Sequence, residues 1–164
     1  MPEQKARVAV VMGSASDRSV MDDTRKVLEE FGVACDVRVL SAHRTPDEAA
    51  AYFKEAEGRG IRVLICAAGG AAHLAGAAAA HSLLPVIAVP LDSSPLKGWD
   101  ALLASVQMPP GVPVATVSVG GWGARNAAFL AIAILALQDS GLRGKLEDFR
   151  RAQREKILTG TPDR

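Results

Sequence analysis

Three short, almost purely apolar runs, each closed by a loop and followed by a helical pattern, constrain this chain most. They are Arg7–Met12, Val63–Ala67 and Val86–Val89, and they lack the apolar–polar alternation of strands with one solvated face. Strands buried on both faces are typical of a parallel sheet that helices cover on both sides. The chain is therefore expected to alternate strands and helices.

The segments between these runs carry helix signals. Ser16 or Asp17 can cap a helix that runs to about residue 31 and stops at Gly32. Thr45 is placed as an N-cap with Pro46 at the first helical position and Glu48 closing a capping box, and this helix ends at residue 58 or 60. The remaining predicted elements are strands at 35–39 and about 114–119, and helices at about 71–81, 99–106, 125–138 and 142–158.

Five successive strand–helix units predict one α/β fold: a three-layer, doubly wound parallel sheet of flavodoxin-like order 2-1-3-4-5. The half-polar strand 35–39 belongs near a sheet edge. A length of 164 residues fits a single catalytic domain, 1–164. The extra C-terminal helix, about 142–158, places sparse apolar residues among many charges, so we expect it to pack on a neighbouring subunit.

Composition excludes several classes of protein. Net charge is +1, from 19 basic and 18 acidic residues, and no basic stripe interleaved with aromatic residues suggests nucleic acid. Cys35 and Cys66 lie in apolar runs without metal-ligand or disulfide spacing, which favours buried thiols in a reducing cytoplasm. No signal-type leader or membrane-spanning run is expected.

Unusual polar residues gather in the loops after the first three strands, at 13–17, 41–46 and 69–74. Ligands of doubly wound sheets bind outside the carboxyl ends of the strands, where the strand order reverses. Order 2-1-3 makes these three loops neighbours. A ligand crevice is therefore predicted there.

The first two loops suit a phosphate. Gly13–Ser16 precedes a helix start, where free N–H groups attract anions, although Ser16 could simply be a cap. Asp17 can orient ribose hydroxyls or favour the helix terminus, and Arg44 can bind phosphate or carboxylate or remain solvated. Neither a GxxxxGK[ST] nor a GxGxxG pattern is present, so a single monophosphate is favoured over a nucleoside triphosphate or a dinucleotide.

Two of the three histidines lie in the predicted crevice. His43 follows a strand end and can transfer protons near neutral pH, and His73 opens a helix, where it can bind substrate or cap backbone. His81, late in an apolar helix, is interpreted as structural. The spacing of the histidines supports no metal site, and no GxSxG elbow supports a serine hydrolase. Proton transfer on a phosphorylated small molecule is the remaining hypothesis.

The three loops resemble signature loops of a known family. Gly-Ser-Ala-Ser-Asp at 13–17, Ser-Ala-His-Arg-Thr-Pro at 41–46 and Gly-Gly-Ala-Ala-His-Leu at 69–74 are similar to those of the bacterial 5-(carboxyamino)imidazole ribonucleotide mutases of purine biosynthesis. Segments 105–109 and 111–113 are similar as well. The resemblance covers about residues 7–157.

This resemblance implies an isomerase without cofactor or metal. The carbamate of the substrate breaks down to carbon dioxide and aminoimidazole ribonucleotide, and the trapped carbon dioxide adds to ring carbon 4. It implies His43 and His73 as catalytic residues, with His43 as the general acid/base and His73 closing the pocket. The implied substrate-binding residues are Ser14, Ser16 and Arg44 for phosphate, Asp17 for ribose, and Ser41, Ala42, Gly69, Gly70, Ala71, Ala72 and Leu74 around the carboxylate and carbon dioxide. A homo-octamer is implied too.

Two departures and two alternatives accompany the resemblance. Ala75 replaces a usual proline, and Gly-Gly-Trp-Gly at 120–123 replaces a common Gly-Lys-Ala-Gly. The related carboxylase, which uses free carbon dioxide, typically has Lys after Ser-Ala-His, so Arg44 favours the mutase. The other alternative is a non-catalytic nucleotide-binding module of the same fold.

Overall fold

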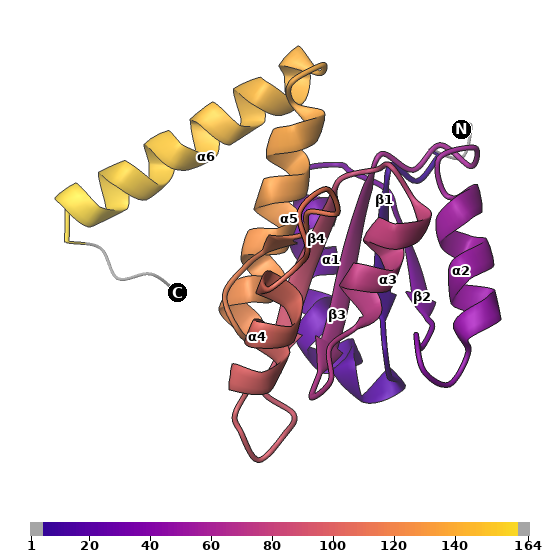
Figure 1. Ribbon diagram of the computed structural model, residues 1–164. Coiled ribbons are helices and arrows are strands. Elements are labelled where there is room, and N and C mark those ends of the chain that lie inside the picture. Colours follow the sequence, from indigo (N-terminus) through magenta and orange to yellow (C-terminus); the bar gives the residue numbers. More distant parts are fainter. Residues whose placement is uncertain (1–4, 161–164) are drawn as a thin grey trace.

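The computed structural model describes residues 5–160 and has one five-stranded sheet of order β2-β1-β3-β4-β5 (Figure 1). Every neighbouring pair of strands is parallel. The predicted fold class and strand order are therefore confirmed, with the half-polar strand at one edge. The strands are β1 Val8–Met12, β2 Cys35–Val39, β3 Val63–Gly69, β4 Val86–Leu91 and β5 Ala115–Thr116.

Helices cover both faces of the sheet and produce three layers. Helices α1 (Arg18–Glu30) and α5 (Gly121–Leu135) pack on one face, and α2 (Pro46–Glu55) and α3 (Leu74–His81) pack on the other. A short 3-10 helix, η1 (Ala15–Asp17), precedes α1, while α4 (Trp99–Val106) lies beside β4 and β5. The last helix is α6 (Ser140–Leu158).

Strand β1 shows why the strands are apolar throughout. Successive side chains of a strand point to opposite faces. Val8, Val10 and Met12 pack under α1 and α5, whereas Ala9 and Val11 face α2 and α3. All five are almost completely buried, so neither face of the central strand can hold a polar side chain.

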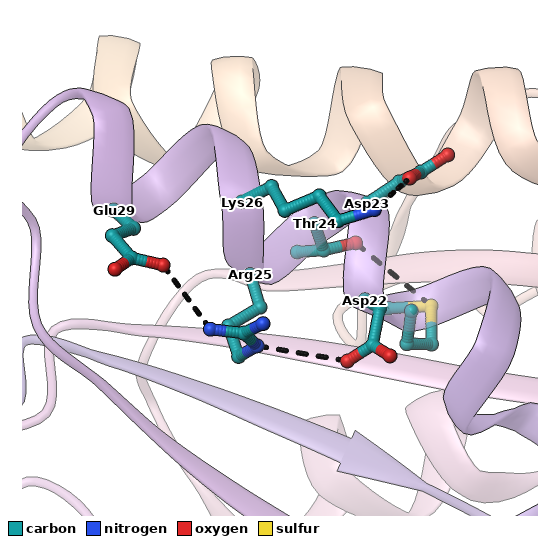
Figure 2. Close-up of polar contacts among 7 residues, drawn as sticks. Asp22, Asp23, Thr24, Arg25, Lys26 and Glu29 are labelled. Atoms are coloured by element: carbon teal, nitrogen blue, oxygen red, sulfur yellow. Dashed lines mark hydrogen bonds and ion pairs between the residues drawn. The ribbon is translucent and has the colours of Figure 1, made fainter.

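Helix α1 has a charged outer side and a buried polar anchor. Its outer side carries ion pairs spaced three or four residues apart, Arg25 with Asp22 and Glu29, and Lys26 with Asp23 (Figure 2). Such exposed pairs contribute only a few tenths of a kcal/mol each, about 0.3–0.5. On the inner side, the fully buried Thr24 hydroxyl donates to the carbonyl of Ala124 at 2.7 Å. This bond fixes α1 against α5.

The predicted bounds of β5 and α5 differ from those in the structure. The strand expected at about 114–119 has only two residues, and the helix expected at 125–138 runs from Gly121 to Leu135. A Cβ on Gly123 would lie 1.6 Å from the carbonyl oxygen of Ser118. The chain therefore turns sharply after Val117 and enters the helix early, a close approach that only glycine permits.

Helix α6 leaves the end of α5 and extends away from the three layers (Figure 1). The first half of α6 packs against the rest of the fold, because Leu142 is buried and Nζ of Lys145 donates to the carbonyl of Phe31 at 2.7 Å. Near its end, Ile157 is 74% exposed. Among residues 5–160, no helix combines the length and hydropathy needed to cross a bilayer. The sequence also predicts a disordered tail at residues 159–164, of which 161–164 lie outside the described residues.

Candidate active site

A cavity of about 340 Å³ opens at the carboxyl ends of β1, β2 and β3. It brings together the three loops that the strand order predicted to be neighbours. The predicted site residues on its wall are Ser14, Ser16, Asp17, Ser41, Ala42, His43, Arg44, Gly69, Ala71, His73 and Leu74. Gly70 and Ala72 do not line it: Ala72 is buried, and Gly70 makes the turn with a φ of 57°.

Hydrogen bonds close the first loop. The hydroxyl of Ser14 accepts the N–H of Ser16 at 3.3 Å and the Ser16 hydroxyl at 2.8 Å. The carboxylate of Asp17 accepts the N–H of Ser14 at 3.1 Å, which completes a capping box. The side-chain cap is therefore made by Ser14, because the 3-10 helix η1 starts three residues before α1. Asp17 occupies the N-cap position of α1, as predicted, but its side chain makes no cap bond to that helix, and Ser16 is not a cap.

Asp17 is a buried carboxyl, with 7% of its surface exposed. Burial raises its pKa, while hydrogen bonds from Ser14 and Ser16 and the charge of Arg44 act in the opposite direction. A carboxylate held this way, with its oxygens oriented by the loop, is a suitable acceptor for hydroxyl groups.

Ser41 organises the second loop. Its hydroxyl oxygen accepts the backbone N–H groups of His43 at 3.3 Å and Arg44 at 3.1 Å. Thr45 Oγ1 accepts the N–H of Ser41 at 2.9 Å and donates to the Ser41 carbonyl at 3.1 Å. The capping box predicted for Thr45 and Glu48 is wrong, since Thr45 makes no side-chain cap bond and its hydroxyl closes the loop instead.

Arg44 joins the second loop to the first. Its Nη2 donates to the carbonyl of Gly13 at 2.8 Å, and its charge lowers the pKa of Asp17 against the effect of burial. The guanidinium is exposed and has further donors in a planar fork. Together with the hydroxyls of Ser14 and Ser16, it makes this end of the cavity suited to a phosphate.

The two predicted histidines meet across the cavity. Nε2 of His43 lies 2.7 Å from Nδ1 of His73, and the rings are edge to face at 87° with centroids 4.8 Å apart. The third loop supports this position through a tight turn in which the N–H of His73 donates to the carbonyl of Ala71 at 2.8 Å. His81 is exposed in the last turn of α3 and does not line the cavity.

Three residues on the wall were not among the predicted site residues: Gly13, Ala68 and Ser93. Ser93 follows β4 and packs so closely on Gly69 that a Cβ there would lie 1.8 Å from its Oγ. Applying the same strand-end rule to β4, the neighbour of β3, would have found Ser93. Within residues 5–160, no three His, Cys, Asp or Glu side chains gather in an arrangement that could hold a metal ion.

The sequence pattern of the AIR carboxylase family, where AIR is aminoimidazole ribonucleotide, matches residues 7–156. The chain belongs to this family. Similar proteins of Brucella melitensis and Escherichia coli are both named N5-carboxyaminoimidazole ribonucleotide mutase. The first is 50% identical over 150 residues, covering 92% of this chain and 93% of the relative. The second is 48% identical over 153 residues, covering 93% and 90%.

Solved members of the AIR carboxylase family share the fold. A crystal structure of Treponema denticola PurE has a TM-score of 0.84 and 29% identity, covering 93% of this chain and 94% of that one. A variant of Treponema denticola PurE2 has a TM-score of 0.86 and 27% identity, covering 96% of each chain. The family resemblance inferred from the three loops is therefore confirmed.

Proposed function

We propose that this member of the AIR carboxylase family is an N5-carboxyaminoimidazole ribonucleotide mutase of purine biosynthesis. It converts 5-(carboxyamino)imidazole ribonucleotide to 4-carboxy-5-aminoimidazole ribonucleotide. One observation carries the proposal: a phosphate-suited end and a pair of contacting histidines share one cavity. The names of relatives about half identical to the chain support the mutase over other activities.

One end of the cavity binds the phosphate and ribose of the substrate, and the other binds its imidazole and carboxylate. The guanidinium of Arg44 and the hydroxyls of Ser14 and Ser16 bind the phosphate, and Asp17 accepts hydrogen bonds from the ribose. The imidazole then extends toward Ser41, Ala42 and the third loop, where Gly69 to Leu74 surround the carboxylate. Charged and hydroxyl donors oriented in advance reduce the cost of ordering the substrate.

The reaction moves one carboxylate and one proton. The N–C bond of the carbamate breaks, its electron pair stays on the exocyclic nitrogen, which takes a proton from His43, and carbon dioxide is held in the cavity. Ring carbon 4 attacks the carbon dioxide, and His43 removes the proton from that carbon. Since the reaction is an isomerisation with no net oxidation or reduction, we expect no redox cofactor and no nucleoside triphosphate, and turnover should persist after exhaustive chelation of metals.

We also propose that the enzyme works in the cytoplasm as a homo-oligomer, an octamer by family resemblance. Helix α6 projects from the fold (Figure 1), and its apolar residues Leu146 and Phe149 are only partly buried while Ile157 is exposed. A neighbouring subunit would cover them.

A label-transfer experiment tests the activity. The carbamate nucleotide carries ¹³C in its carboxylate, and a large excess of unlabelled bicarbonate is present. A mutase transfers the labelled carboxylate to ring carbon 4, so mass spectrometry would find ¹³C in the carboxylate of the product. Unlabelled product formed from aminoimidazole ribonucleotide and bicarbonate would identify the carboxylase instead, and nucleotide binding without product would identify a binding module.

A further inference from the structure

The rings of His43 and His73 contact each other through one nitrogen of each ring. The residues belong to different loops, 30 positions apart, yet Nε2 of one lies 2.7 Å from Nδ1 of the other. A nitrogen–nitrogen distance this short requires a hydrogen bond, so one of the two atoms carries a proton and the other accepts it. A proton can therefore pass directly between the two rings.

Hydrogen bonds hold the backbone of the two residues that carry the rings. The N–H of His43 donates to Ser41 Oγ, and the carbonyl of His73 accepts the N–H of Ala77 at the start of α3. The other charged side chains that line the cavity are Asp17 and Arg44, which attract each other. Among the ionisable side chains of the described cavity wall, the two histidines contact each other directly.

We infer that His73 is a positioning residue and that the two histidines together, rather than His43 alone, form the acid–base unit. The inference rests on the proposed function, because it assigns a proton route within the same site. Since Nε2 of His43 contacts His73, Nδ1 is the nitrogen of the His43 ring that remains to exchange a proton with the substrate.

Protons and electrons balance over this route. The pair starts with one extra proton: Nδ1 of His43 and both nitrogens of His73 are protonated. When the N–C bond breaks, the exocyclic nitrogen takes the Nδ1 proton of His43, and the proton of His73 Nδ1 moves to His43 Nε2. Both rings are then neutral. After carbon 4 has attacked carbon dioxide, His43 Nδ1 removes the carbon 4 proton, the shared proton returns to His73, and the pair is restored.

His73→Asn tests this route, with His81→Asn as the matched control on the same helix. Deuterium exchange at the imidazole Cε1–H, read by mass spectrometry, gives a titration curve for each of the three histidines in the free protein. In His73→Asn we expect a changed titration curve for His43, an altered pH profile of kcat, and a kcat about 10- to 100-fold lower with KM within about threefold. His81→Asn should match the wild type.

Two results would overturn the inference. One is an unchanged His43 titration curve in His73→Asn. The other is a kcat that falls equally at every pH, as a merely structural defect would give. If His73→Asn folds poorly, His73→Gln supplies the same readouts. Because exchange is measured without substrate, a failure of label transfer in the wild type would refute the proposed function without deciding whether the histidines titrate together.

Discussion

Replacing Gly69 with alanine should destabilise the protein through a single contact. A Cβ at this position would lie 1.8 Å from Ser93 Oγ, 3.2 Å from Ser93 Cβ and 3.5 Å from the carbonyl oxygen of Leu91. Rotation of the Ser93 side chain can relieve the first distance, but the Cβ–Cβ distance remains too short. Either β3 or the loop after β4 must therefore move.

The size of the effect follows from two opposing terms. Overpacking of this kind costs about 1–3 kcal/mol, while replacing glycine in a strand returns about 0.5–1 kcal/mol by restricting the unfolded chain. The net loss of unfolding free energy should be about 1–2 kcal/mol. For a chain of this length, that lowers Tm by about 2–8 °C.

Thermal unfolding at matched protein concentrations measures this loss, with Gly13→Ala as control. Gly13 lines the same cavity, but a Cβ there would meet no atom closer than 3.8 Å, so Tm should equal that of the wild type or rise by up to about 4 °C, since the unfolded chain is restricted in the same way. In a double-mutant cycle, Ser93→Gly removes both the Oγ and the Cβ of Ser93, so it should reduce the cost of Gly69→Ala by about half or more. An unchanged Tm for Gly69→Ala, or no recovery in the double variant, would refute the reasoning.

Four further predictions concern the site and the assembly. His43→Asn should lower turnover at least about 100-fold while product affinity, measured calorimetrically, stays within about tenfold; near-normal turnover would make His73 the next candidate. Arg44→Ala should instead weaken nucleotide binding about 10- to 100-fold, since it removes a charged hydrogen-bond donor; an unaltered KM would contradict this. Because burial raises the pKa of Asp17 from 3.8, the native state binds more protons above that pH, and the stability contributed by Asp17 falls as pH rises. Asp17→Asn should abolish this component in urea unfolding, whereas identical pH slopes would exclude it. Light scattering should give a multiple of 17.1 kDa, and a monomer at micromolar concentration would exclude the proposed assembly.

The fold could be predicted because the apolar runs of the sequence indicate where the strands lie and how deeply each is buried. The hydrophobic pattern alone distinguishes fully buried strands, such as Val63–Ala67, from the half-polar strand at the sheet edge. The rules for connections between parallel strands then restrict the possible strand orders. The hydrophobic pattern gave the wrong element bounds where a single close contact between backbone segments determines the path of the chain. The apolar run at 114–119 suggests a full strand, but the contact of Gly123 with the Ser118 carbonyl turns the chain into α5.

The site could be predicted as a set of loops but not as a set of contacts. Strand order places the three loops together, whichever hydrogen bonds they form. The choice of partner for a hydroxyl or carboxylate depends on geometry. Asp17 and Thr45 occupy the predicted N-cap positions of α1 and α2, but neither side chain makes a cap bond there: Ser14 caps η1, and Thr45 closes the loop of Ser41. The approach of His43 to His73 is equally absent from the sequence, since it depends on side-chain directions in two loops.

The hydrogen bonds of the first loop indicate how phosphate affinity is divided. The hydroxyl of Ser16 already donates to Ser14 Oγ and contacts Asp17, so a bound phosphate gains these donors only in exchange for bonds that the loop makes with itself. Such an exchange yields little net free energy. The charge of Arg44 is not consumed in this way, because its bond to the neutral carbonyl of Gly13 leaves the cationic fork able to attract an anion. Affinity should therefore depend more on Arg44 than on the serines. Release of the Ser16 hydroxyl from the Asp17 carboxylate on phosphate binding would in turn leave that carboxylate available to the ribose. The phosphate and the ribose of the nucleotide would then be recognised together.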